Sequence, residues 1–311
     1  MKMNNLFVIL FLLVFSPNSY SQEQCRSRFL ADSFWMKGLR DEAIIHYKGL
    51  VDEAIEQHKP PFIDRDLYRV AACFCYKNLP DSASYYYDLA LKAGYYFDPE
   101  PNNALNCIKK RPEYEGYRSR ALQNRQNKFK IIDTLLLNEF LEREYWDQYY
   151  RELHRMDSLR NLADSTFLLQ EYEEKGRLCD RANSHFLDSI LDVYQCWPGY
   201  SVMGQKGDQA AWAIAQHADH DVAFQEKCLV FLQEAYAKGD TYSHNVAYLY
   251  DRIMVNKGLK QRYGTQMRIL DGKVTFINLE DEQNVEYYRV CYSLPPLYIY
   301  KKALEERYLK K

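Results

Sequence analysis

Glycine and proline are scarce in this sequence of 311 residues, which has 12 Gly and 10 Pro. Together they make about 7% of the chain, against a norm of roughly 12%. Because a fold of many short strands needs turn residues at short intervals, this scarcity argues against a β-sandwich and favours long helices. The remaining composition, 47% hydrophobic and 27% charged, is that of a globular protein and excludes a disordered or collagenous chain.

Long apolar runs are also missing once the first 21 residues are set aside. Residues 6–15 are all apolar, but about 20 such residues are needed to cross a bilayer. Lys2 precedes this run, and Ser19 and Ser21 place small residues at the −3 and −1 positions of a cleavage site. We therefore expect residues 1–21 to be a signal peptide, with an N-terminal membrane anchor as the alternative. After cleavage the chain would have no stable membrane span and would be exported, to the periplasm or the extracellular space.

Neither sign of charge dominates the sequence. It has 41 Lys and Arg and 43 Asp and Glu, which gives a formal net charge of −2. Nucleic-acid binding depends on basic surfaces that neutralise phosphates, and no segment of this chain is strongly basic. We therefore expect no nucleic-acid partner and no binding to anionic lipid.

Familiar site motifs are absent as well. Eight cysteines occur, none in a CxxC pair, so neither a zinc knuckle nor a thioredoxin-type motif is supported. An even number of cysteines in an exported protein permits disulfides, but the spacing does not assign their partners. There is also no GxSxG, HExxH, P-loop or GxGxxG sequence.

The first hundred residues contain a repeat with an offset of 40. Ala31 and Phe34 match Ala71 and Phe74, and the pair Ala43–Tyr47 matches Ala83–Tyr87. Small residues let two antiparallel helices approach closely, while the aromatic residues fill the groove between them. This pattern resembles the tetratricopeptide (TPR) repeat over about residues 30–95, with a longer connector around residues 59–62. The resemblance implies a helical-repeat surface that binds a protein or peptide partner.

Residues 121–195 are predicted to be helical, and the pattern of residues changes at Trp197. Residues 121–195 have apolar residues at helical spacing, with separate helices expected over about 164–176 and 178–194. A turn at 197–200 and a loop through 204–207 come next. Helices are then expected over about 210–217, from 222 to 238, and from Ser243 to a stop at Gly258. Asp271-Gly272 predicts a type I′ turn between two strands, which gives a β-hairpin.

Five short motifs follow one another in the C-terminal half: WPGY (197–200), AAWAIAQHADHD (210–221), YLYDR (248–252), QRYGTQ (261–266) and LPPLYIY (294–300). With them, residues from about 178 to 300 resemble a widespread bacterial family of uncharacterised proteins. The resemblance implies a helical domain with a small hairpin, but no reaction.

The strongest cluster of chemically capable side chains lies in residues 217–221. On a continuing helix, His217, His220 and Asp221 would share one face and could hold a divalent metal ion such as Zn, Mn or Fe. A metal-free alternative makes His217 a general base oriented by a carboxylate, with Arg252 holding an anion. The structural alternative makes Asp219 or Asp221 the N-cap of the next helix. No cofactor is required by the sequence.

Two groups of candidate site residues follow from these patterns. Residues on the loop that enters the hairpin can present polar side chains at little energetic cost, and we assign them to ligand binding. The candidate catalytic residues are His217, Asp219, His220, Asp221, Asp251 and Arg252, and the candidate ligand-binding residues are Gln261, Tyr263, Thr265 and Gln266.

The sequence thus predicts an all-α protein with one small β-hairpin. The leading functional hypothesis is an exported TPR-type binding or interaction protein. The alternatives are an enzyme, for example a hydrolase, that uses the His/Asp/Arg cluster, and a structural subunit of an envelope assembly. The predicted segments are a signal peptide (1–21), a TPR-like unit (22–120) and a helical domain (121–311) with its hairpin at 265–278.

Overall fold

The computed structural model describes residues 22–56, 63–99, 103–152 and 165–309. The predicted signal peptide and the connector at residues 59–62 lie outside the described residues. Helices account for most of the described chain, and its only sheet has two strands. The predicted fold class, all-α with a small hairpin, is confirmed.

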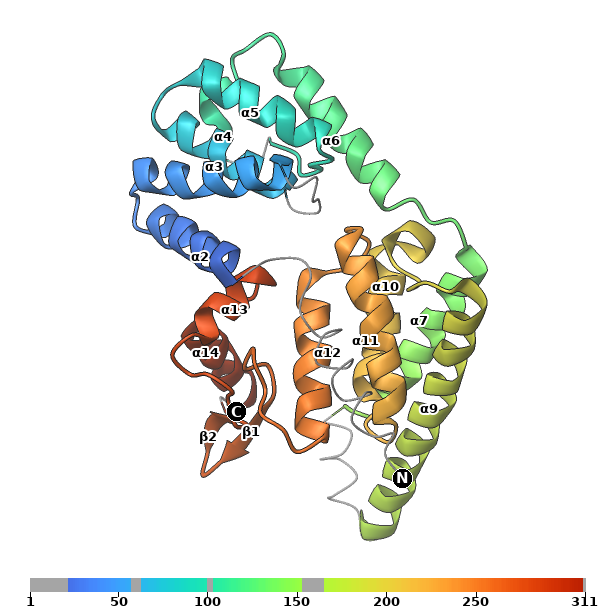
Figure 1. Cartoon of the computed structure of the whole chain (residues 1–311). Coiled ribbons are helices and arrows are strands. Elements are labelled where there is room, and N and C mark those ends of the chain that lie inside the picture. Colours follow the sequence, from blue (N-terminus) through green and yellow to red (C-terminus); the bar gives the residue numbers. More distant parts are fainter. Residues whose placement is uncertain (1–21, 57–62, 100–102, 153–164, 310–311) are drawn as a thin grey trace, which may run out of the picture.

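The N-terminal unit is built from successive helices that pack side by side (Figure 1). Its elements are α2 (Gln22–Met36), α3 (Arg40–Glu56), α4 (Ile63–Tyr76), α5 (Pro80–Lys92), the short 3₁₀ helix η1 (Asn103–Ile108) and α6 (Tyr114–Lys128).

Most of the residues that match between the two repeats are buried within this unit. The four alanines at the equivalent sites of α2, α3, α4 and α5 are fully buried, and so are the tyrosines that follow in α3 and α5. Methyl side chains let the helices approach closely, which is the physical role that the repeat predicts for them. The TPR resemblance itself stays a prediction. The buried residues are Ala31, Ala43, Tyr47, Ala71, Ala83 and Tyr87.

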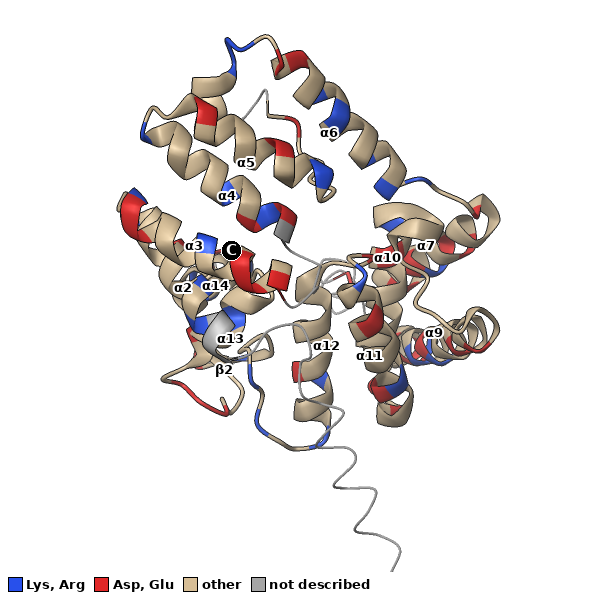
Figure 2. Cartoon of the chain, turned by 45° about the horizontal axis from the view of Figure 1, so that its top comes forward, with Lys and Arg blue, Asp and Glu red and all other residues tan. Residues whose placement is uncertain are grey.

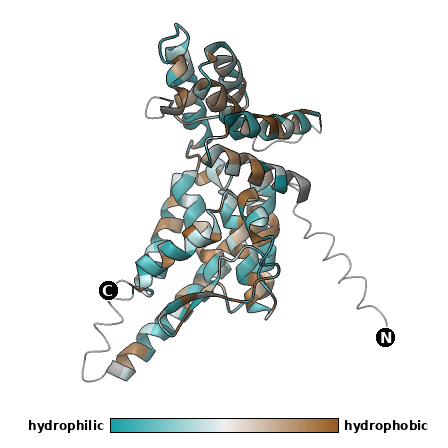
Figure 3. Ribbon diagram, turned by 90° about the vertical axis from the view of Figure 1, so that its left-hand side faces the viewer, coloured by the Kyte–Doolittle hydropathy of each residue, from teal (hydrophilic) through white to brown (hydrophobic). Residues whose placement is uncertain are grey.

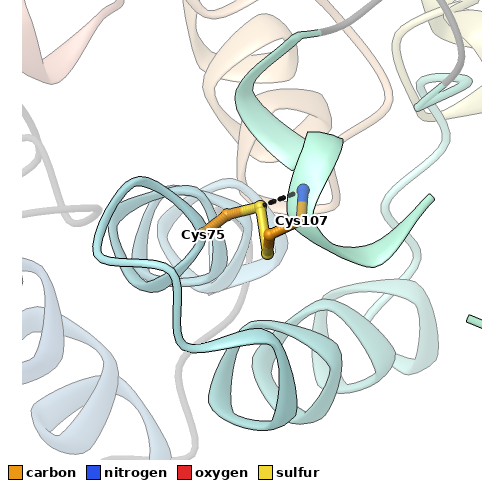
Figure 4. The surroundings of a disulfide bond; sticks show 2 residues. All are labelled: Cys75 and Cys107. Carbon is orange, nitrogen blue, oxygen red and sulfur yellow. Dashed lines mark hydrogen bonds between the residues drawn. A yellow bond between two sulfur atoms is a disulfide. The ribbon is translucent and has the colours of Figure 1, made fainter. Parts of the chain in front are cut away.

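A disulfide joins Cys75 at the end of α4 to Cys107 in η1 (Figure 4). The backbone N–H of Cys107 also donates to the Cys75 sulfur over 2.8 Å. Cys291 takes part in a disulfide too. Four further cysteines are free thiols: Cys73, Cys179, Cys196 and Cys228.

The second unit is a stack of helices that surrounds the largest hydrophobic core. Two expectations need correction here. Residues 165–194 form one helix instead of two. Gly176 lies inside this helix, next to the Cβ of Tyr150, and does not end it. The loop expected through 204–207 is reduced to a kink at Gly204, whose φ is 69°. The helices are α7 (Thr134–Tyr149), α9 (Ser165–Tyr194), α10 (Tyr200–His217), α11 (Val222–Ala237) and α12 (Ser243–Asn256).

The buried clusters of the N-terminal and C-terminal helices involve separate stretches of the chain. The core of the first unit extends to Ala121, and the core of the second begins with Leu136. The boundary predicted after residue 120 falls inside α6, which continues to Lys128. In the second core, Phe140 of α7 and Leu187 of α9 are fully buried together with apolar residues of α10–α12.

The predicted hairpin is present. Strands β1 (Met267–Leu270) and β2 (Lys273–Phe276) pair antiparallel, with Met267 opposite Phe276. Asp271 and Gly272 have φ values of 48° and 69°, the left-handed conformations that a type I′ turn needs. Two helices, α13 (Val285–Cys291) and α14 (Leu297–Tyr308), complete the chain.

The C-terminal helix α13 returns to the N-terminal unit and packs on α2 (Figure 1). Phe29 and Tyr287 meet edge to face there, with ring centroids 4.9 Å apart. Acidic and basic residues are interspersed over both units (Figure 2), and most helices alternate hydrophilic and hydrophobic residues (Figure 3). Within the described chain, no helix combines the length and the apolar character required to span a bilayer.

Candidate functional site

The turn between α10 and α11 holds the densest group of predicted site residues. α10 ends at His217, and α11 begins after its N-cap, Asp221. The helix does not continue through this segment, so the side chains of His217, Asp219 and His220 reach different neighbours. The turn is therefore the junction of two polar networks, one toward α7 and α9 and the other toward α12.

Asp221 has a local structural role. Its side chain accepts a hydrogen bond from the backbone N–H of Phe224 over 3.0 Å. This bond satisfies one of the N–H groups that every helix start leaves without a partner. The observed contact is the one that the structural alternative predicted for this carboxylate.

His217 is paired with Asp147 of α7. Its Nδ1 lies 2.9 and 2.8 Å from the two carboxylate oxygens, and the Asp147 side chain is only 1% exposed. Because a carboxylate can only accept, Nδ1 carries the proton and Nε2 is the basic nitrogen of the neutral ring. Nε2 has no hydrogen-bond partner among the described residues, and the His217 side chain is 23% exposed. This arrangement can support general-base chemistry at Nε2.

Arg151 extends the same network toward α9. Its guanidinium donates to Asp147 Oδ1 over 2.7 Å and to Asp180 Oδ1 over 2.6 Å. Burial raises the pKa of Asp180, although the bond from Arg151 works in the opposite direction. The cation therefore balances two carboxylates beside His217.

His220 has a different partner, Ser184 of α9. The His220 Nε2 and Ser184 Oγ lie 3.1 Å apart. Ser184 donates its one hydroxyl proton to the carbonyl of Arg181 over 2.9 Å, so it accepts from Nε2. A serine that is held in this way is not activated as a nucleophile, because no base receives its proton.

The second network joins Asp219 to α12. Arg252 Nε donates to Asp219 Oδ1 over 2.8 Å, and Arg252 Nη1 donates to Gln266 Oε1 over 3.2 Å. Asn256 adds a bond of 2.8 Å to Asp219 Oδ1. Burial works to raise the pKa of Asp219, but the hydrogen bonds and charge of Arg252 bring it below its ordinary value. This is an ion pair that links the turn to the hairpin loop.

Asp251 organises the loop that enters the hairpin from inside the protein. It is fully buried, and it accepts from the backbone N–H groups of Arg262, Tyr263 and Thr265 over 2.8–3.0 Å. The hydroxyl of Thr265 donates to it as well, over 2.9 Å. Burial raises the pKa of Asp251, against these hydrogen bonds. The carboxylate thus fixes the loop from beneath.

The ligand-binding candidates on this loop point inward. Gln261, which is fully buried, donates to the carbonyl of Gln266 over 2.7 Å and accepts from the Gln266 N–H over 2.8 Å. Tyr263 is 3% exposed and Thr265 is 4% exposed. The polar groups of these residues stabilise the loop and do not face solvent. Of the four ligand-binding candidates, only Gln266 also contacts Arg252.

The structure thus brings some candidates together and separates others. Asp219, Arg252 and Gln266 meet, whereas His217, His220 and Asp221 each contact a different group. Among the described residues, no group of three or more His, Cys, Asp or Glu side chains is placed to hold a metal ion.

Sequence reasoning missed Asp147, Arg151, Asp180 and Ser184, which complete the surroundings of the histidines. They lie on α7, directly after it (Arg151) and on α9, far from residues 217–221 in the sequence. The spacing of Asp147 and Arg151, at i and i+4, is a signal for a helical ion pair. It does not reveal that a histidine 70 positions away shares the carboxylate.

A second candidate site is the cavity between the N-terminal unit and α13. It has a volume of about 310 Å³ and is lined by α2, α4 and the segment from α13 to Pro296. Trp35 and Phe29 form apolar parts of its wall, and Arg69 and Glu286 bring charges of both signs. Met36 at the end of α2 also lines it and is 69% exposed.

Comparison with known proteins identifies the C-terminal part alone. Residues 174–311 match the model of a family of unknown function (DUF6624). This match is consistent with the resemblance of residues 178–300 to an uncharacterised family. Neither a curated protein nor a solved structure matches the chain. Asp147 and Arg151 lie before the matched segment, so the His217 network joins residues inside and outside it.

Proposed function

We propose that this chain is an exported binding protein that takes a protein or peptide partner on its helical N-terminal unit. The observation that carries the proposal is the cavity between α2, α4 and α13, about 310 Å³ in volume. It lies on the unit that the repeat pattern assigns to partner binding. Support for export comes from the signal-like residues 1–21 and from the disulfide between Cys75 and Cys107, since disulfides persist in oxidising compartments.

The chemistry of this cavity suits an extended peptide with one large apolar side chain. Trp35 and Met36 offer apolar surface, and the guanidinium of Arg69 lies 5.3 Å from the Trp35 ring centroid. Arg69 and Glu286 can bind the peptide backbone or side chains of either charge. An apolar anchor in a pocket with polar groups at its rim is the usual composition of a binding hot spot.

The proposal is tested by selecting peptides from a random displayed library on the mature full-length chain. The affinity of a selected peptide is then measured for Met36→Glu and for a control, Leu135→Glu, which places the same charge at an exposed position of α7. We expect Met36→Glu to weaken binding at least tenfold, because it puts a carboxylate in the apolar wall, and Leu135→Glu to leave it unchanged. A library that yields no specific peptide, or equal affinities for the two variants, would refute the proposal.

Proton-transfer catalysis, for example in a hydrolase, is the second candidate function. It is favoured by one observation, the Asp147–His217 pair, in which Nδ1 faces the carboxylate and the side chain of His217 is 23% exposed. His217 would take a proton from an attacking water, and Asp147 would stabilise the imidazolium that forms. His220, by contrast, is paired with Ser184, whose hydroxyl donates to the backbone carbonyl of Arg181.

A panel of chromogenic ester, phosphoester and glycoside substrates tests this candidate on the full chain. Any turnover should fall at least a hundredfold in His217→Asn and in Asp147→Asn, as is typical for loss of a general base. His220→Asn serves as the matched control and should stay within a fewfold of the original rate. Absence of turnover on the whole panel, or equal rates for His217→Asn and His220→Asn, counts against catalysis.

A further inference from the structure

We propose a second ligand site, in the cavity where α6 faces the turn between α11 and α12, that binds a small organic anion with a flat aromatic body. The proposal does not depend on the peptide site described above, because different residues and a different cavity carry it. The site is formed by the juxtaposition of Lys128 from the N-terminal unit with Tyr200 and Tyr242 from the C-terminal unit.

The cavity has a volume of about 390 Å³, which is within the range of small-molecule sites. Its walls come from both units: the start of α4, the segment from Ala93 to Tyr96 and the end of α6 on one side, and residues 237–243 on the other. Since neither unit forms it alone, its shape depends on how α6 and the α11–α12 turn are held together.

Lys128 is the central cation of the site. Its ammonium donates to the carbonyl of Gly239 over 2.8 Å, the one hydrogen bond that it makes to the described residues. An ammonium has three N–H donors, so two are left for a ligand. The ammonium also lies 5.3 Å from the Tyr96 ring and 5.8 Å from the Tyr200 ring, contacts that hold the cation in place without using its N–H groups.

Other charges around the cavity leave an excess of positive charge. Arg65 and Lys238 also line the cavity, and the one acidic residue in its lining is Asp64. Burial raises the pKa of Asp64, and the charge of Arg65 works in the opposite direction. Asp240 interacts electrostatically with Lys128 and accepts from the N–H and hydroxyl of Ser201 over 2.7 and 2.8 Å. Three cations, Arg65, Lys128 and Lys238, thus face these two carboxylates. An anionic group beside Lys128 is therefore electrostatically favoured.

Aromatic walls determine what kind of anion fits. Tyr96 and Tyr200 are almost fully buried, and Tyr200 meets Tyr242 edge to face, with centroids 5.2 Å apart. Tyr242 is partly exposed and offers ring surface to the cavity, while Tyr96 and Tyr200 complete the wall behind it. A hydrated inorganic anion would leave that surface unused, whereas an aromatic carboxylate can place its ring on Tyr242 and its charge near Lys128.

Binding of three small probes to the full-length chain tests the site: benzoate, benzyl alcohol and inorganic phosphate. A ligand as small as benzoate is expected to bind with a Kd on the order of 1 mM, which ligand-observed NMR can measure. Benzoate should bind at least fivefold more tightly than benzyl alcohol, which lacks the charge, and than phosphate, which lacks the ring. Equal binding of benzoate and either other probe, or no binding of benzoate, would overturn the proposal.

Variants then locate the site. Lys128→Gln and Asn127→Asp should each weaken benzoate binding at least fivefold, the second without touching the bond between Lys128 and Gly239. Lys206→Gln removes an exposed charge from α10 and should have no effect, and neither should Met36→Glu at the peptide site. Binding that survives both Lys128→Gln and Asn127→Asp would show that the ligand lies elsewhere and would refute the assignment.

Discussion

Individual buried carboxylates carry much of the structure of the C-terminal unit. Asp251 is a clear case, because four donors from the hairpin loop converge on it. A buried donor that loses its acceptor costs about 1–3 kcal/mol. These contacts stabilise the loop, and the catalytic role suggested from the sequence stays a hypothesis.

We predict that Asp251→Ala lowers the free energy of unfolding by at least about 3 kcal/mol, since several buried N–H groups lose their acceptor at once. The control is Glu282→Ala, which removes an exposed carboxylate from the segment after the hairpin and should change stability by less than about 0.5 kcal/mol. Urea unfolding followed by circular dichroism measures both. Equal stability of the two variants would contradict the role of Asp251.

Asp208 gives a prediction about pH. Burial raises its pKa to about 7, although hydrogen bonds from Trp197 and Thr241 work to lower it. An unfolded Asp has a pKa of about 3.9, so between about pH 4 and 7 the folded state holds a proton that the unfolded state has lost. Stability therefore falls as pH rises through this window, by at most about 1.4 kcal/mol per pH unit.

Asp208→Asn cannot titrate, so its stability relative to the original chain should increase steadily as pH rises from about 4 to about 7. If the amide itself changes the free energy of unfolding by a constant amount, the difference between the two proteins shifts equally at every pH and its slope against pH stays the same. Urea unfolding at several pH values measures the slope. Parallel pH profiles for the two proteins would show that Asp208 has an ordinary pKa in the folded state.

At the scale of elements, the Cys75–Cys107 disulfide fixes η1 to the end of α4 and joins two cysteines that are 32 positions apart in the sequence. Cross-links of this kind typically stabilise a protein by about 2–4 kcal/mol. We predict a loss of that size in the variant with Ala at both positions, measured by urea unfolding under oxidising conditions. Cys196→Ala, which removes a free thiol, is the control and should leave stability almost unchanged. A double variant as stable as the control would argue against a stabilising cross-link.

Elements with a local signal were predictable from the sequence. Asp271-Gly272 specified the hairpin because a type I′ turn needs two residues with positive φ, and strands β1 and β2 flank it as expected. The helix break expected after Gly176 failed for an equally physical reason. A helix tolerates an interior glycine at a cost of about 1 kcal/mol, and here the missing side chain lets Tyr150 pack close.

The candidate site was only partly predictable, because its partners come from distant helices. The sequence indicated that His217 could have an orienting carboxylate, but it did not indicate Asp147, which is reached only when α7 packs on α10. Asp251 and Arg252 are neighbours in sequence, yet one is buried beneath the hairpin loop and the other pairs with Asp219. Helical periodicity does not show that difference.

At the scale of the whole molecule, the two units are not independent. α13 packs on α2, and Lys128 of α6 bonds to Gly239 after α11, so contacts between the units are made at two separate places. The two cavities assigned to ligands lie at these same contacts. A repeat pattern predicts a surface for partners, and in our proposal the C-terminal unit forms part of that surface.

Hydrogen exchange of the full chain, with and without a selected peptide, tests the central claim that the partner binds between α2 and α13. Backbone N–H groups in α2 and in the segment from α13 to Leu297 should exchange more slowly when the peptide is bound. Those in α7 and α9, on the far side of the second unit, should be unchanged. Slowing that is confined to α7, α9 and α10 would place the partner beside His217 and would contradict the account.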